Sequence, residues 1–118
     1  MEYELVYLAI PYSSDDPKEI EYRVEMLCKI DSLLMKQGVF TVSPVFKHFT
    51  LKYRNLPGNW TYWEKYSKNL MSKCDALYII KLNGWKNSEG IREEIAEAKR
   101  LCIPIVYLDP DLFIIEIE

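Results

Sequence analysis

The sequence predicts an α/β fold, a small doubly wound parallel sheet of four to five strands with helices on both faces. Of its 118 residues, 49% are hydrophobic and 28% are charged, which suits one packed domain spanning residues 1–118. Short apolar runs, typical of strands buried on both faces, alternate with longer segments of helical periodicity. Such alternation gives right-handed β-α-β units and therefore a parallel sheet of the flavodoxin or Rossmann type.

Five apolar runs are predicted as strands. Proline or a polar cluster ends the first two, at Pro11 and at Ser43-Pro44. The third run is introduced by Asp75. The predicted strands cover residues 5–10, 39–42, 76–80, 103–108 and 112–117.

Three segments between these runs are predicted as helices. Ser88 is a good N-cap for the last of them, and residues 45–59 are expected to be irregular because Pro57-Gly58 is a clear turn signal. The helices are placed between Pro17 and Gly38, from near Asn59, and from Ser88 through Leu101. Periodicity predicts three buried stripes: Ile20, Val24, Leu27, Cys28 and Leu34; Trp63, Tyr66, Leu70 and Cys74; Ile91, Ile95, Ala98 and Cys102.

Charge and cysteine content narrow the class of protein. Fifteen Lys and Arg against eighteen Asp and Glu give a net charge of −3, which argues against a nucleic-acid partner. No segment suits a membrane span, and the acidic start does not resemble a signal peptide. Cys28, Cys74 and Cys102 are interpreted as reduced core thiols of a cytoplasmic protein. With one histidine, His48, and no spaced thiols, no metal site is expected.

The fold predicts where a ligand binds. In open α/β sheets, ligands lie beyond the carboxyl ends of the strands, at a topological switch point. The loops there are residues 11–16, 43–48 and 82–90. The first strand is not followed by a glycine-rich dinucleotide fingerprint, and the sequence has no Walker-type loop. We therefore expect a small-molecule ligand and no nicotinamide, flavin or other cofactor.

Glu94 is the strongest local candidate for chemistry. It falls at the border of the buried stripe of the last helix, close to the carboxyl edge of the sheet. A part-buried carboxylate near a strand-end pocket can act as a nucleophile or a base. The alternative is a surface glutamate that pairs along the helix with Arg92 or Lys99.

Several motifs in order resemble the nucleoside 2-deoxyribosyltransferase superfamily. Residues 6–12, VYLAIPY, resemble its opening strand and loop. The pattern Ser88-x-Gly90-Ile91-x-x-Glu94-Ile95, followed by Ile103-Pro104-Ile105, resembles its second signature. Residues 74–77, which lead into the third predicted strand, also fit the superfamily. Residues 56–60 with Trp63, and Gly84-Trp85, resemble a small subfamily of this group.

This resemblance implies cleavage or transfer at an N-glycosidic bond. Glu94 would attack the anomeric carbon of the sugar, as in retaining glycosidases, and Tyr7 would orient it. Ser88 stands where transferases of this superfamily carry aspartate and where its nucleotide hydrolases carry serine. A hydroxyl at a helix N-terminus suits a phosphate, so a (deoxy)nucleoside 5′-monophosphate is favoured. Gly90 is expected to bind the same substrate, and Ser13, Ser14 and Arg92 are weaker phosphate candidates, since each could serve an ordinary cap, turn or surface role.

Aromatic residues are candidates for holding the base. The chain has nine Tyr, four Phe and three Trp; most of them are expected in the core, and any that are spare could stack on a flat ligand or form a subunit contact. Tyr12, Trp60 and Trp63 are expected to stack on a base, beside Pro11 of the first strand-end loop. The remaining aromatic surface is the alternative basis for assembly without any ligand.

One position departs from the superfamily pattern. Ser67 occupies the place of the aspartate that assists protonation of the leaving base, and a serine is a poor acid at neutral pH. Glu64, about one turn earlier, or His48, on the loop after the second strand, could substitute. If neither does, the protein is expected to bind a nucleotide with weak or no turnover. The resemblance also implies a homodimer or higher homo-oligomer, with the apolar residues 112–115 as an edge or interface element.

Overall fold

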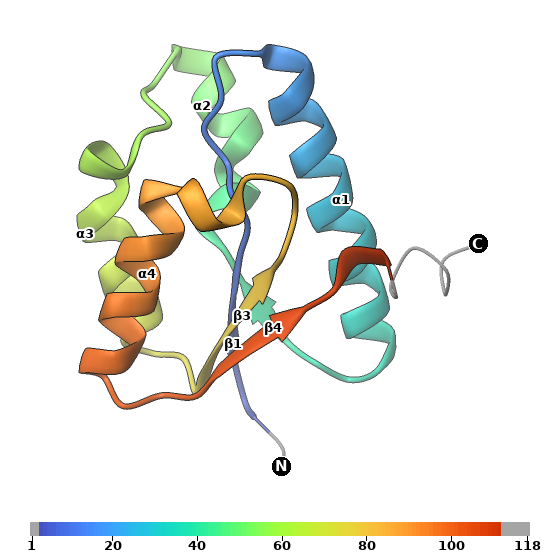
Figure 1. Ribbon diagram of the computed structural model, residues 1–118, viewed down its shortest axis with the longest axis vertical. Coiled ribbons are helices and arrows are strands. Elements are labelled where there is room, and N and C mark those ends of the chain that lie inside the picture. Colours follow the sequence, from blue (N-terminus) through green and yellow to red (C-terminus); the bar gives the residue numbers. More distant parts are fainter. Residues whose placement is uncertain (1–2, 112–118) are drawn as a thin grey trace.

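The computed structural model describes residues 3–111 and contains a four-stranded, all-parallel sheet with helices on both faces (Figure 1). The strand order is β2-β1-β3-β4, with every neighbouring pair parallel. The strands are β1 (Val6–Ala9), β2 (Thr41–Val42), β3 (Ala76–Ile80) and β4 (Ile105–Leu108). The predicted small doubly wound α/β fold is confirmed. The predicted fifth strand at residues 112–117 lies outside the described residues.

Side-chain alternation along the central strands divides the core into two layers. On one face, Tyr7, Ala9, Leu77 and Ile79 pack against α3 (Trp60–Met71) and α4 (Glu89–Arg100). On the other face, Leu8, Ile10 and Ile80 pack against α1 (Pro17–Lys36). Figure 1 shows α1 on one side of the sheet and α3 and α4 on the other. Because successive strand residues point to opposite faces, this alternation directs Tyr7 towards α4.

The strand order creates a switch point between β1 and β3. The chain leaves β1 through α1 to reach β2, whereas it leaves β3 through α4 to reach β4 on the opposite side. The loops that follow β1 and β3 therefore diverge above their carboxyl ends. A crevice at this place is the usual ligand position in open α/β sheets.

The segment predicted as irregular contains two short helices. After β2 the chain forms the 3-10 helix η1 (Pro44–Lys47) and then α2 (His48–Arg54). Pro44 suits a first helical position, and the hydroxyl of Ser43 accepts a hydrogen bond from the Val45 N–H at 3.2 Å. The turn signal at Pro57-Gly58 applies only to the residues after α2.

The predicted buried stripes are partly wrong. In α3 the buried residues are Ser67 and Met71, whereas Tyr66 is 42% exposed, because this helix turns a different edge towards α4. Cys28 is exposed on α1, and Cys102 is exposed where the chain turns after α4 with a φ of 58°. Of the three free thiols, only Cys74 is buried. The remaining stripe residues are buried or half-buried as predicted.

Within residues 3–111, none of the helices has the length and apolar character needed to cross a membrane.

Candidate active site

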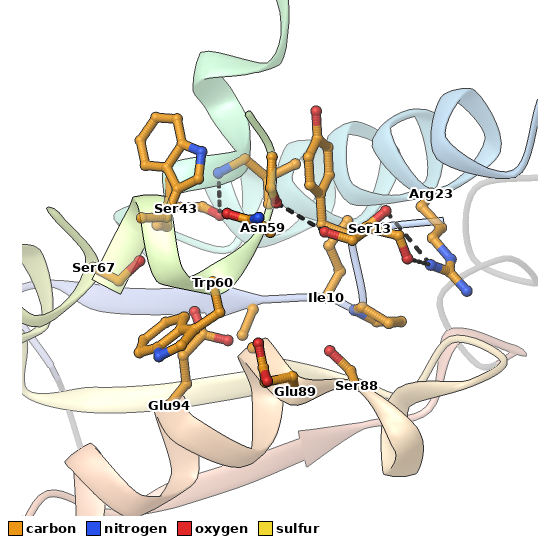
Figure 2. A pocket seen from close by; sticks show the side chains of 18 of the residues that line it. Ile10, Ser13, Arg23, Ser43, Asn59, Trp60, Ser67, Ser88, Glu89 and Glu94 are labelled. Atoms are coloured by element: carbon orange, nitrogen blue, oxygen red, sulfur yellow. Dashed lines mark hydrogen bonds between the residues drawn. The ribbon is translucent and has the colours of Figure 1, made fainter. Parts of the chain in front are cut away.

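A cavity of about 420 Å³ lies at the carboxyl ends of β1 and β3. It is lined by the loops that follow β1, β2 and β3, by α3 and the N-terminal half of α4, and by single residues of α1 and α2. In Figure 2, Ser88 and Glu89 lie along one side, and Ser13 and Asn59 lie along the opposite side. Of the sequence-predicted residues, those in the lining are Pro11, Tyr12, Ser13, Trp60, Trp63, Ser67, Ser88, Gly90 and Glu94.

A buried carboxylate lies in the lining of this cavity. Glu94, on the second turn of α4, is only 7% exposed, so it is more buried than its predicted border position. The hydroxyl of Tyr7, which is fully buried in β1, donates a hydrogen bond to Glu94 Oε2. The alternative of a surface Glu94 paired with Arg92 or Lys99 is therefore wrong.

Burial changes the acidity of both partners. Removal from water disfavours the charged carboxylate and raises the pKa of Glu94 from 4.5 to about 8, while the hydrogen bond from Tyr7 opposes this rise. Burial and the nearby Glu94 hold the pKa of Tyr7 well above its usual 10.0, and a hydrogen bond from Ser67 acts in the opposite direction. A carboxyl group with a pKa near neutrality is suited to catalysis.

The N-terminus of α4 forms part of the lining. Ser88 is the N-cap, as predicted, and its hydroxyl oxygen accepts from the Ile91 N–H at 3.2 Å. The hydroxyl hydrogen of Ser88 is thus available to a ligand. A methyl group at Gly90 would lie 3.8 Å from Ser88 Oγ and 3.9 Å from a Trp60 ring carbon, so the glycine leaves open space beside the cap.

Aromatic rings form much of the remaining lining. Tyr12, Trp60 and Trp63 all border the cavity, as the sequence predicts. The indole N–H of Trp63 donates to the Pro57 carbonyl at 2.9 Å, which ties α3 to the preceding turn. A flat heterocycle can stack on such rings.

Four candidates from the sequence lie elsewhere. Glu64 does not border the cavity, and its carboxylate is paired with Lys68 at 2.7 Å. His48 starts α2 rather than lying on a loop, and it is buried behind Tyr12. The Ser14 hydroxyl accepts from the Asp16 N–H at 3.1 Å, and Arg92 is exposed outside the lining.

Other lining residues were not singled out from the sequence, although Ser43, Asn87 and Glu89 lie within the predicted strand-end loops at residues 43–48 and 82–90. They are polar or charged side chains whose positions depend on the tertiary fold, namely Arg23, Ser43, Asn59, Asn87 and Glu89. Glu89 carried a usable signal, since it follows the predicted cap Ser88 directly. The sequence held no signal that Arg23 lines the site, because a basic residue on an amphipathic helix usually faces solvent.

Arg23 joins the two loops that form the crevice. Its guanidinium donates to the Ser13 carbonyl at 2.9 Å and to the Asn83 carbonyl at 3.3 Å. Glu19 pairs with the same group at 3.1 Å. Its hydrogen-bonding capacity is thus largely used by the protein, and Arg23 holds the loops after β1 and β3 together across the switch point.

In the part of the chain that the structure describes, no group of three His, Cys, Asp or Glu side chains could hold a metal ion. The side chains that line the cavity carry carboxylates, hydroxyls, amides, a guanidinium and aromatic rings.

Replacing Glu94 with Gln is expected to remove a pH-dependent cost of folding. Between about pH 4.5 and pH 8 the native protein retains a proton on Glu94 that the unfolded chain releases. The free energy of unfolding of wild type therefore falls as the pH rises through this range: the cost of burying Glu94 is absent at low pH and complete above about pH 8. The whole shift corresponds to a free energy on the order of 5 kcal/mol. The melting temperature of Glu94→Gln relative to wild type should therefore rise by several degrees between about pH 5 and pH 8.5. A difference that stays constant with pH, as expected for the control Glu93→Gln, would contradict the assignment.

Comparison with known proteins identifies a family but no activity. The family model described as Domain of unknown function (DUF1937) matches residues 4–109. The matched region includes Tyr7, Glu94 and every residue that lines the cavity. A search of curated proteins finds no significant match. The chain belongs to the DUF1937 domain family.

Proposed function

We propose that this protein cleaves the N-glycosidic bond of a (deoxy)nucleoside 5′-monophosphate, with Glu94 as the nucleophile, and passes the sugar to water or to another base. The observation that carries the proposal is the buried Tyr7–Glu94 pair at a cavity on the switch point of the sheet. The resemblance of this pair and of its surrounding motifs to the nucleoside 2-deoxyribosyltransferase superfamily supports the same reaction.

The reaction uses Glu94 in its ionised form. A carboxylate oxygen attacks the anomeric carbon as the bond to the base nitrogen breaks, and the base leaves with that electron pair and takes up a proton. Water or a second base then attacks the same carbon, which releases the sugar and restores the carboxylate. The hydrogen bond from Tyr7 stabilises the ionised carboxylate and orients it.

The start of α4 supports a phosphate at the 5′ end of the substrate. The first N–H groups of a helix have no partner within the helix, and the positive end of its dipole attracts anions. The free hydroxyl hydrogen of Ser88 adds a donor beside them. The stacking of the base is assigned to Tyr12, Trp60 and Trp63, which line the same cavity.

A second candidate function is nucleotide binding with weak or no turnover. Ser67 is 2% exposed and borders the cavity at the position where the superfamily carries its acid. Glu64, the nearest carboxylate of that helix in the sequence, is engaged by Lys68. A pocket that holds the nucleotide but lacks an acid for the leaving base would act as a sensor or regulator.

The proposal includes a homodimer or higher homo-oligomer in the cytoplasm. Large aromatic side chains lie exposed on and next to the helix that contributes Leu51 to the lining, with Phe49 at 63% and Tyr53 at 87% exposure. A partner chain on this surface would enclose the substrate further.

Release of free base from deoxynucleoside 5′-monophosphates, followed by liquid chromatography, tests the proposed function. Wild type is expected to release the base, and Glu94→Gln should lower kcat by about 10³-fold or more while it still binds the nucleotide. Glu93→Gln, on the same helix but outside the lining, should match wild type. Saturable binding without release by wild type would select the second candidate function. Neither binding nor release would contradict both.

Tyr7→Phe is expected to move the pH profile of kcat/KM towards higher pH. The variant loses the hydrogen bond that lowers the pKa of Glu94, so burial alone sets this pKa and the ionised nucleophile forms at higher pH than in wild type. The rise of kcat/KM with pH is the quantity to measure. A uniform loss of rate with an unshifted profile would show that Tyr7 has only a structural role.

Glu89→Gln is expected to lower KM for the 5′-monophosphate. The Glu89 carboxylate lines the same cavity next to Ser88, where it would repel a phosphate. Removing one nearby like charge should lower KM roughly fivefold, with little change for the corresponding nucleoside. Equal changes for both substrates would place the phosphate away from the start of α4.

A further inference from the structure

A second cavity of about 460 Å³ lies next to the candidate active site. It is lined mainly by the start of α1, by α2 and by the turn that follows α2. The residues common to the linings of both cavities are Tyr12, Ser13, Leu51, Gly58 and Asn59. The boundary between the two spaces is therefore made by one strand-end loop, one turn and the side chain of Leu51.

Tyr12 is held in this boundary by His48. Tyr12 Oη and His48 Nδ1 are 2.7 Å apart, and the two rings meet edge to face at a centroid distance of 5.8 Å. His48 is only 4% exposed. Its Nε2 atom lies 3.5 Å from the Glu21 carboxylate, which favours the tautomer with the proton on Nε2. Nδ1 is then the acceptor for the Tyr12 hydroxyl.

Gly58 holds the other side of the Tyr12 ring. A methyl group at Gly58 would lie 3.0 Å from Tyr12 Cε2, tighter than most side-chain contacts in proteins, so the ring would have to shift to admit it. The hydroxyl of Ser13 donates to the Gly58 carbonyl at 2.8 Å, which ties this turn to the loop that carries the ring. Hydrogen bonding at the phenol and close packing on the ring leave Tyr12 little freedom.

We propose that the Tyr12 ring forms a partition between the two cavities and so limits the size of the base that the candidate active site accepts. His48 and Gly58 are the residues that position this ring. The inference rests on the proposed function and specifies the substrate class of the same site. The base is expected against the aromatic part of the lining, which includes Tyr12. A bulky substituent on the base would collide with the ring, whereas removal of the ring would admit that substituent to the second cavity.

The proposal is tested by the relative kcat/KM for two substrates that differ only in a benzyl group on the exocyclic amine of the base. Deoxyadenosine and deoxycytidine 5′-monophosphates and their N-benzyl derivatives provide two such pairs. Tyr12→Ala should raise the ratio of kcat/KM for the benzylated over the plain substrate by about tenfold or more. This ratio does not change with the fraction of folded enzyme, so a merely structural defect leaves it as in wild type.

Two milder variants test the hydrogen bond by which His48 positions Tyr12. Tyr12→Phe keeps the ring but loses its hydrogen bond to His48, and His48→Leu removes the acceptor. Each should raise the ratio in the same direction as Tyr12→Ala but by less, and the double variant should equal either single one because both remove one interaction. Tyr22→Ala, at a 51% exposed tyrosine on α1 that lines neither cavity, is the matched control and should leave the ratio unchanged.

The outcomes separate this inference from the function on which it rests. Base release by wild type with an unchanged ratio in all Tyr12 and His48 variants would overturn the partition and leave the proposed function intact. Absence of base release by wild type from every plain and benzylated substrate would overturn the proposed function and the partition with it.

Discussion

The candidate site depends on the hydrogen bond that Tyr7 donates to the buried carboxyl of Glu94. A carboxyl group so far from water is costly to ionise, and the tyrosine is the donor that lowers this cost. The pair forms because Tyr7 points to the α4 face of the central strand and because the Ser88 cap fixes where α4 begins. A shift of β1 by one residue would turn Tyr7 to the opposite face and leave the carboxyl buried without its donor.

The doubly wound topology places a ligand-sized cavity beside the Tyr7–Glu94 pair. Divergent connections after β1 and β3 open a crevice directly beside Glu94, and Arg23 keeps the two diverging loops at a fixed separation through their carbonyl groups. The cap of α4 and the aromatic residues of α3 then place donors and flat surfaces around one carboxylate. The loop after β1, which Ser13 ties to the turn after α2 through the Gly58 carbonyl, carries Tyr12 to the boundary with the second cavity.

The strands and the Glu94 site could be predicted because they depend on local signals. Apolar runs indicated β1 and β3, and the Ser88 pattern indicated both the cap and the carboxylate. Other features depend on tertiary packing. Glu64 was predicted near the site, but α3 buries the Ser67 and Met71 edge, which leaves Glu64 to pair with Lys68. The roles of Arg23 and His48 depend on partners distant in sequence, such as Asn83 and Tyr12, so no local pattern could reveal them.

A covalent intermediate on Glu94 distinguishes nucleophilic attack from every role in which this carboxylate only binds or orients a ligand. The most direct measurement is mass spectrometry of peptides from wild-type protein that is quenched with acid during turnover of a deoxynucleoside 5′-monophosphate. We expect the peptide that contains Glu94 to carry the mass of one deoxyribose phosphate residue, with the ester on Glu94 rather than on Glu93 or Glu97. Turnover with no such adduct, or with the adduct on a different residue, would contradict the assignment of Glu94 as the nucleophile.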